Sequence, residues 1–194
     1  MRPFLLAYVL IGVILLGELI ARGGKRPESR RRDRGSLWVI ALLTGSGYWL
    51  AFLFAAYAAA HPTWRAAHPG YFLGAWASWA AVALTVGGMG FRLWAVRLLG
   101  RYFTRDVRVS ADQPVVEAGP YRLIRHPSYT GALAAGAGVG LALGAWPCPL
   151  LILAGKVPSF LYRIRVEEAA LVEAIGEPYR AYRARTKRLI PHVW

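Results

Sequence analysis

Residues 119–129 read Gly119-Pro120-Tyr121-Arg122-Leu123-Ile124-Arg125-His126-Pro127-Ser128-Tyr129, and the hydrophobic run that follows them carries no charge until Lys156. A second polar segment, Arg163-Ile164-Arg165-Val166-Glu167-Glu168, directly follows the next hydrophobic run. A helical hairpin made of the two runs would bring both polar segments to the same side of a membrane. Charges beside hydrocarbon are costly unless they are paired or functional. The sequence therefore predicts an active site where the two segments meet.

The composition is that of an integral membrane protein. Of 194 residues 56% are hydrophobic and 13% aromatic, and the mean hydropathy is +0.36. A membrane span needs about 20 apolar residues and must be helical, because lipid offers the backbone no hydrogen-bond partners. Five blocks qualify as candidate spans: Phe4–Ala21, Ser36–Ala60, Tyr71–Trp94, Thr130–Trp146 and Cys148–Tyr162. The expected fold is an all-α polytopic membrane helix bundle of about five transmembrane helices, with a cytoplasmic carboxy-terminal helical segment.

The first block is expected to be a retained helix and not a removed signal peptide. It is followed by Arg22-Gly23-Gly24-Lys25-Arg26 in place of a small-residue cleavage site. We expect one domain over residues 1–194, with three spans in residues 1–98. Residues 99–194 hold a cofactor-binding loop, the helical hairpin and the carboxy-terminal helices. The tail reads as helix through Ile175, a Gly176 cap, and a second helix from Glu177 that ends before Pro191.

The position of the basic residues predicts the orientation of the chain. The net charge is +14, and seven Lys or Arg lie in residues 22–34, six in 97–125 and seven in 163–188, whereas residues 61–70 hold only Arg65. An excess of Lys and Arg in short loops marks the cytoplasmic face. The amino terminus is therefore expected outside and the carboxy terminus in the cytoplasm. The basic face should attract anionic lipid head groups, and we expect no nucleic-acid partner.

Cysteine and histidine give no metal-binding pattern. Cys148 is the only cysteine, and the four histidines are dispersed without an i, i+4 pair. We therefore predict no structural metal. Lys156 lies inside the fifth block, where we interpret it as a snorkelling side chain, and a place in a lipid entrance stays open. Gly136, Gly140 and Gly144 share one helical face and should pack closely on the next helix.

The residues beside the hydrophobic runs have a bland interpretation and a functional one. In the first interpretation, Arg125-His126-Pro127 only flank a membrane helix. In the second, Pro127 in the first helical turn leaves the positive end of the helix free to bind an anion, and His126 and Tyr129 add hydrogen-bond donors. Glu167 and Glu168 point about 100° apart on a helix, so at most one readily faces a pocket. Arg163 is four residues before Glu167, a spacing that also suits an ordinary surface ion pair.

Several segments, in order and spacing, resemble the isoprenylcysteine carboxyl methyltransferase family. The matching residues are Leu99-Gly100-Arg101-Tyr102-Phe103, Gln113-Pro114-Val115-Val116-Glu117-Ala118-Gly119-Pro120-Tyr121, Arg125-His126-Pro127-Ser128-Tyr129-Thr130-Gly131, Arg163, Glu167-Glu168, Leu171, Gly176-Glu177-Pro178-Tyr179 and Tyr182.

The resemblance implies a small polytopic methyltransferase that uses S-adenosylmethionine on the cytosolic side and takes a lipid-like acceptor from the bilayer. It implies that the cofactor is bound by Gln113, Pro114, Val115, Val116, Tyr121, His126, Pro127, Ser128, Tyr129 and Glu167, and that Arg163 contacts the acceptor. We add Arg125 to the cofactor-binding residues because the turn from Arg125 to Tyr129 offers polar groups, and we take Arg163 and Glu167 as the catalytic pair.

The favoured reaction is methyl transfer to a carboxylate of a lipid-like or prenylcysteine-like acceptor. A carboxylate is already ionised at neutral pH and needs no general base, whereas a phospholipid amine would need one, with Glu167, Glu168 or His126 as candidates. Phospholipid N-methylation is thus the alternative within transferases. An NADPH-dependent sterol-type reductase, which shares the His-Pro-x-Tyr turn, and a non-enzymatic membrane scaffold are the further alternatives. The sequence leaves the natural acceptor and the oligomeric state open.

Overall fold

The computed structural model describes residues 3–21, 30–31, 33–104, 107–109 and 113–191. In chain order its elements are α1 (Pro3–Ile20), β1 (Arg30–Arg31), α2 (Ser36–Ala60), α3 (Pro62–Ala67), η1 (Pro69–Tyr71), α4 (Trp76–Leu99), η2 (Gly100–Tyr102), β2 (Arg108–Val109), η3 (Gly119–Arg122), α5 (Pro127–Ala142), α6 (Pro147–Ile175) and α7 (Glu177–Arg185). The η elements are single turns of 3₁₀ helix, and β1 and β2 form one short antiparallel pair.

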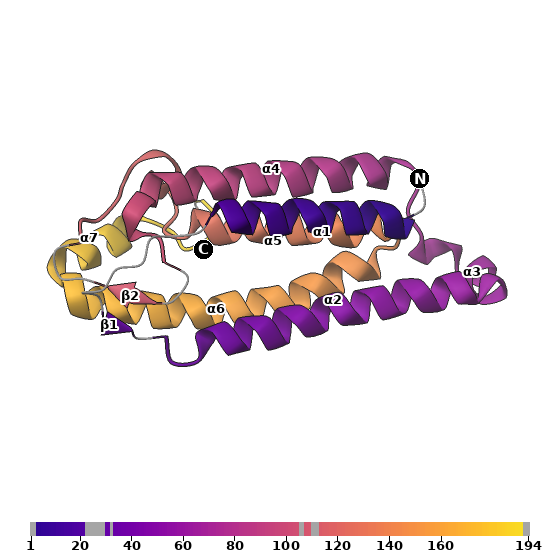
Figure 1. The fold of residues 1–194 in the computed structure, drawn as a ribbon, viewed down its shortest axis with the longest axis horizontal. Coiled ribbons are helices and arrows are strands. Elements are labelled where there is room, and N and C mark those ends of the chain that lie inside the picture. Colours follow the sequence, from indigo (N-terminus) through magenta and orange to yellow (C-terminus); the bar gives the residue numbers. More distant parts are fainter. Residues whose placement is uncertain (1–2, 22–29, 32, 105–106, 110–112, 192–194) are drawn as a thin grey trace.

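The expected all-α membrane bundle is confirmed. Within the described residues, the long helices α1, α2, α4, α5 and α6 run alternately up and down along the long axis (Figure 1). The short helix α3 lies at the end where the chain begins, and α7 and the β1–β2 pair lie at the other end. Most of the Arg-rich segment 22–34, on which the expected orientation partly depends, lies outside the described residues.

The outward faces of the bundle are apolar, as a lipid-facing surface requires. The helices α2 and α4 are each long and apolar enough to cross a bilayer, whereas α1 is apolar but shorter. Trp38 on α2 and Trp79 on α4 are 75% and 79% exposed. A soluble monomer rarely exposes so many large apolar side chains together. The molecule is therefore a membrane protein.

The predicted blocks locate the five long helices, but only α2 has the predicted bounds, Ser36–Ala60, at both ends. Helix α4 begins and ends five residues later than the block Tyr71–Trp94, and α5 begins three residues and ends four residues earlier than the block Thr130–Trp146. Helix α6 begins at Pro147, one residue before the predicted Cys148, because a proline in the first turn of a helix loses no hydrogen bond through its missing N–H. The span predicted to end at Tyr162 continues as the same helix to Ile175, so the fifth span and the first tail helix are one element.

Glycines let α5 fit between α4 and α6. A Cβ on Gly140 would lie 2.4 Å from the Cα of Pro149 on α6, and one on Gly131 would lie 2.5 Å from the Gly88 carbonyl oxygen on α4. Close packing of Gly136 and Gly140 on the next helix is thus as predicted. Gly144 is not part of that face: it follows α5 at φ +79, a conformation that favours glycine, in the turn to α6.

The carboxy-terminal tail closes back onto the segment before α5. The backbone N–H of Arg125 donates to the carbonyl of Lys187 at 2.7 Å, and that of His126 donates to the carbonyl of Arg188 at 3.0 Å. The backbone N–H of Lys187 in turn donates to Leu123. These bonds hold the polar residues that precede α5 against the tail that follows α7.

Candidate active site

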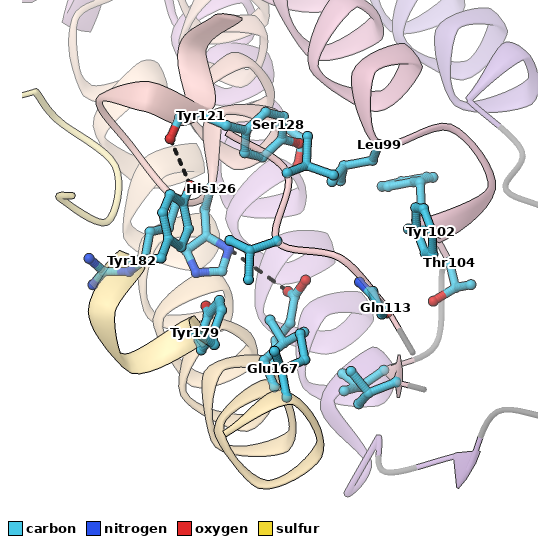
Figure 2. A pocket seen from close by; sticks show the side chains of 18 of the residues that line it. Leu99, Tyr102, Thr104, Gln113, Tyr121, His126, Ser128, Glu167, Tyr179 and Tyr182 are labelled. Atoms are coloured by element: carbon cyan, nitrogen blue, oxygen red, sulfur yellow. Dashed lines mark hydrogen bonds and ion pairs between the residues drawn. The ribbon is translucent and has the colours of Figure 1, made fainter. Parts of the chain in front are cut away.

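The two polar segments singled out in the sequence line one pocket at the α7 end of the bundle (Figure 2). Arg163 and Glu167 reach it from α6, and His126 and Tyr129 reach it from the start of α5. The residues expected at the site that line this pocket are Gln113, Pro114, Val115, Val116, Tyr121, Arg125, His126, Ser128, Tyr129, Arg163 and Glu167. Pro127 is not in the lining; it is fully buried in the first turn of α5.

Tyr129 lies between the two residues expected to be catalytic. Its hydroxyl donates a hydrogen bond to Glu167 Oε2 at 3.0 Å and accepts one from Arg163 Nε at 3.4 Å. The carboxylate of Glu167 is 32% exposed and also lies 4.0 Å from His126 Nδ1. Figure 2 shows Glu167 pointing toward His126 inside the pocket. This part of the pocket therefore presents a partly exposed carboxylate to a ligand, a setting that favours a cationic group.

The neighbouring acid, Glu168, is buried and serves the fold. Its carboxylate accepts hydrogen bonds from Arg125 Nε at 2.8 Å and from Arg188 at 3.4 Å, and it lies 3.3 Å from His126 Nε2. Burial would raise the pKa of Glu168, but the bonds and charges of His126 and Arg125 outweigh burial and lower that pKa to about 2. Glu168 lies beyond the expected span, which ends at Tyr162, and fixes the ring of His126 from behind.

Arg125 is held by the tail and by Glu168. Besides Glu168, its guanidinium donates to the backbone carbonyls of Thr186 and of Arg183, the latter at 3.1 Å. We expected backbone N–H groups at the start of α5 to bind an anion. Two of them are already bonded within the protein, because the N–H groups of Tyr129 and Thr130 both donate to the His126 carbonyl. A direct role of Arg125 toward a ligand stays a prediction.

Arg163 is oriented by a residue that the sequence analysis missed. Its Nη1 donates to Asp33 and, at 2.7 Å, to Ser36 Oγ, and the Ser36 hydroxyl donates to Asp33 at 2.7 Å. The side chains of Arg163 and Asp33 are 4% and 5% exposed. Burial would raise the pKa of Asp33, but the bonds from Ser36 and Leu37 and the charge of Arg163 lower it. The signal in the sequence was an acid placed among arginines, Arg30-Arg31-Arg32-Asp33-Arg34.

Aromatic side chains form much of the remaining wall. Tyr179 and Tyr182 lie one turn apart on α7, both buried, and the Tyr182 hydroxyl donates to the carbonyl of Tyr121 at 2.8 Å. Burial raises the pKa of both tyrosines, so both stay neutral hydrogen-bond donors. Tyr102 and Phe103 line the opposite side. In the sequence analysis Tyr102, Phe103, Tyr179 and Tyr182 stood only in the matched motifs and were given no role, whereas Tyr121 was expected to bind the cofactor.

A second, larger cavity of about 580 Å³ adjoins the pocket. Its walls come from α1, α2, α4, α5 and α6, and most of them are apolar. Four residues line both spaces: Phe103, Thr104, Tyr129 and Arg163. The pair of cavities thus joins a polar pocket at one end of the bundle to an apolar space between the helices. Among the described residues no group of three or more His, Cys, Asp or Glu side chains is placed to hold a metal ion.

The fold and the site define a helical membrane protein with a carboxylate-bearing pocket that opens on an apolar cavity. The model of the isoprenylcysteine carboxyl methyltransferase (ICMT) family matches residues 81–173. The protein-S-isoprenylcysteine O-methyltransferase of Schizosaccharomyces pombe is 33% identical over 106 residues, which are 54% of this chain and 45% of that protein.

A solved structure gives the same result. The chain superposes on the eukaryotic intramembrane Ras methyltransferase ICMT (isoprenylcysteine carboxyl methyltransferase) with a TM-score of 0.57 and 27% sequence identity, over 78% of this chain and 52% of that one. The resemblance seen in the sequence is therefore confirmed. The chain spans about half the length of the relatives that it matches.

Proposed function

We propose that this protein transfers a methyl group from S-adenosylmethionine to a carboxylate of a lipid-like acceptor, at the cytoplasmic side of a membrane that its five long helices cross. The observation that carries the proposal is the position of Tyr129 and Arg163, which line both the polar pocket and the apolar cavity. A polar cofactor on one side and an apolar acceptor on the other would meet there. The S. pombe relative, a protein-S-isoprenylcysteine O-methyltransferase, supports the same chemistry.

The residues of the pocket suit S-adenosylmethionine. The exposed carboxylate of Glu167 matches its cationic groups, and the rings of Tyr102, Tyr179 and Tyr182 offer apolar faces for its base. The free volume is about 90 Å³, whereas pockets for small molecules usually measure about 300 Å³ or more. We therefore expect the lining to move apart when the cofactor binds, and the irregular segment from Gln113 to Val116 is one part of the wall that no helix holds.

The side chains would act by positioning and charge. When bound, the cofactor supplies a methyl group on a cationic sulfur; a carboxylate oxygen can bond to the methyl carbon without a general base, while the carbon–sulfur bond breaks and a neutral thioether leaves. Arg163, held by Asp33 and Ser36, would orient that carboxylate. Glu167 would hold the cofactor's positive charge, and Tyr129 would fix the distance between them. Holding two reactants in line, away from water, supplies most of the acceleration in such reactions.

Phospholipid N-methylation remains the alternative transferase reaction, and it needs a base. With its pKa near 2 and its oxygens bonded to Arg125 and Arg188, Glu168 is a poor base. Glu167 and His126 would then share that task. Exposed cations on the tail, among them Arg185 and Lys187, are in place to contact anionic lipid head groups.

Thermal unfolding of the purified protein in detergent tests the proposal. S-adenosylhomocysteine should raise the melting temperature and NADPH should not, because a ligand that binds only the native state stabilises it by mass action. Stabilisation by NADPH alone would replace the proposal with a reductase. No response to either ligand would favour a scaffold.

A further inference from the structure

The apolar cavity contains a cation, Lys156, that has no role in the proposed methyl transfer. Lys156 lies on α6 with only 7% of its surface exposed, and its side chain lines the cavity. Its ammonium makes no hydrogen bond or ion pair with any residue in the described ranges. The ammonium lies over two aromatic rings, with Nζ 5.6 Å from the centroid of Tyr48 and 5.4 Å from that of Phe160. A buried cation in a membrane span that has aromatic rings but no carboxylate beside it points to a ligand.

The charges around the cavity leave Lys156 unbalanced. Arg92 lines the same space, but it is paired with Glu18 through two bonds, at 2.7 and 3.0 Å. Arg163 is paired with Asp33. Of the cations in the cavity wall, Lys156 therefore lacks a carboxylate partner in the described structure. The cavity carries a net positive charge in apolar surroundings, and an anion would bind there with little competition from water.

The bundle also makes room for the lysine side chain. A Cβ on Gly136 of α5 would lie 2.8 Å from Lys156 Cδ and 3.0 Å from Cε. Glycine at this position thus lets the side chain lie flat against α5 inside the cavity. Seven residues separate Lys156 from Arg163 on one helix, a rise of about 10 Å, so the two cations lie on nearly the same face at different depths.

We propose that the cavity binds the chain of an anionic lipid and that Lys156 recognises its carboxylate or phosphate group. This inference rests on the proposed function and narrows it, because the same cavity reaches Tyr129 and Arg163. The acceptor class would be acidic amphiphiles that carry an anionic group about 10 Å deeper than the methylated one. A purely hydrocarbon isoprenoid chain would leave the ammonium unmatched.

The test measures binding of matched sixteen-carbon probes to the purified protein in a neutral detergent. Palmitate and hexadecyl phosphate carry an anion, and hexadecanol does not. The wild type should prefer both anionic probes over hexadecanol. Lys156→Met keeps the length of the side chain and removes the charge, so it should weaken binding of the anionic probes by at least about tenfold and leave hexadecanol binding unchanged.

Two further variants separate charge from folding. Gly136→Ala keeps the charge but pushes the flexible end of Lys156 aside, and it should reduce the preference for anionic probes without loss of the fold. Arg65→Met removes an exposed cation of α3, at the other end of the bundle from the pocket, and should behave as wild type. An anion preference that survives in Lys156→Met and disappears in Arg163→Met would overturn the proposal.

Failure of the methyl-transfer proposal would look different. Stabilisation by S-adenosylhomocysteine is measured separately from probe binding, and so is transfer of labelled methyl, which uses a dicarboxylate amphiphile whose two acid groups lie about 10 Å apart. Anion binding that depends on Lys156, together with methyl incorporation, identifies an acceptor. The same binding without incorporation identifies a resident acidic membrane lipid and still supports the site. Binding that is independent of Lys156 contradicts the site even if the enzyme is active.

Discussion

Two adjacent glutamates on α6 have different roles because their side chains point in different directions. Glu167 faces the pocket and bonds to the Tyr129 hydroxyl, whereas Glu168 points into the protein and binds Arg125 and His126. The sequence could predict that only one of the two faces the pocket. It could not predict that the other joins four basic side chains, because three of those lie in the distant segments before α5 and after α7.

Replacing Glu167 should affect the cofactor without affecting the fold. Glu167→Gln removes the charge that we assign to cofactor binding, and affinity for S-adenosylhomocysteine should fall by at least about tenfold. Isothermal titration or the ligand-induced change in melting temperature measures this. Glu177→Gln, an exposed glutamate of α7, is the matched control and should bind as wild type. Equal affinity in Glu167→Gln and wild type would remove Glu167 from the cofactor site.

Glu168 should make the fold sensitive to acid. Its pKa is about 2 in the folded state, below the ordinary value of 4.5, so its contribution is complete above pH 4.5 and is lost as the pH falls toward 2. The loss should be about 3 kcal/mol of unfolding free energy. Melting temperatures at pH 6 and pH 3 measure the part of this loss that occurs above pH 3, about 2 kcal/mol. In Glu168→Gln the protein should be less stable at pH 6 and should lose less on acidification, and an equal acid response in both proteins would contradict this assignment.

Asp33 should act on the acceptor through Arg163. In Asp33→Asn the guanidinium loses its buried ionic partner, and the KM for the acceptor should rise by about tenfold while affinity for S-adenosylhomocysteine stays unchanged. A change in the KM for the acceptor without a change in affinity for S-adenosylhomocysteine distinguishes positioning of Arg163 from general misfolding. A parallel loss of affinity for the cofactor product would mean that Asp33 supports the whole pocket.

At the scale of elements, α5 is the helix that positions the site, and glycine determines how closely its neighbours approach. Its first turn carries Tyr129, and its two faces contact α4 and α6 along their length. Its backbone approaches α4 closely at Gly131 and α6 closely at Gly140. Small residues permit this contact between membrane helices.

Two adjacent glycines of α4 test this packing. A Cβ on Gly88 would lie 2.7 Å from the Gly131 carbonyl oxygen and from the Ala135 nitrogen, both backbone atoms that cannot easily move. A Cβ on Gly87 would meet nothing within 4 Å. Gly88→Ala should therefore lower the unfolding free energy by about 1–3 kcal/mol, and Gly87→Ala should not lower it. Denaturation in mixed detergent measures both; a stable Gly88→Ala variant would contradict the close contact.

The helices were predictable from the sequence, and the contacts between distant segments were only partly so. Hydropathy predicted both bounds of α2 correctly and located the other four long helices. It missed the continuity of α6, because a change from apolar to charged residues looks like a boundary although the backbone continues. Most of the pocket residues were predicted from the resemblance to a known family, whereas Tyr102, Tyr179 and Tyr182 were given no role. Asp33 did not, because its importance arises from a contact with Arg163, 130 residues away.

For the whole molecule, we expect the five alternating helices to cross the membrane, with the α3 end outside and the α7 end in the cytoplasm. Cys148 is buried, so in a Cys148→Ala background single cysteines at His68 or Arg180 report each side. A membrane-impermeant maleimide should label His68→Cys in intact cells and Arg180→Cys only after permeabilisation. The reverse pattern would invert the orientation.

The pairing of the tail with the segment before α5 has a consequence for biosynthesis. The backbone N–H groups of Arg125 and His126 donate to Lys187 and Arg188, and Arg163 is paired with Asp33, so the pocket needs contacts from the first loop through to residue 188. During synthesis the pocket therefore cannot close until residues 187 and 188 have left the ribosome, when all five long helices have already been made. A stop codon shortly before residue 187 should leave a bundle that inserts into the membrane but does not bind S-adenosylhomocysteine.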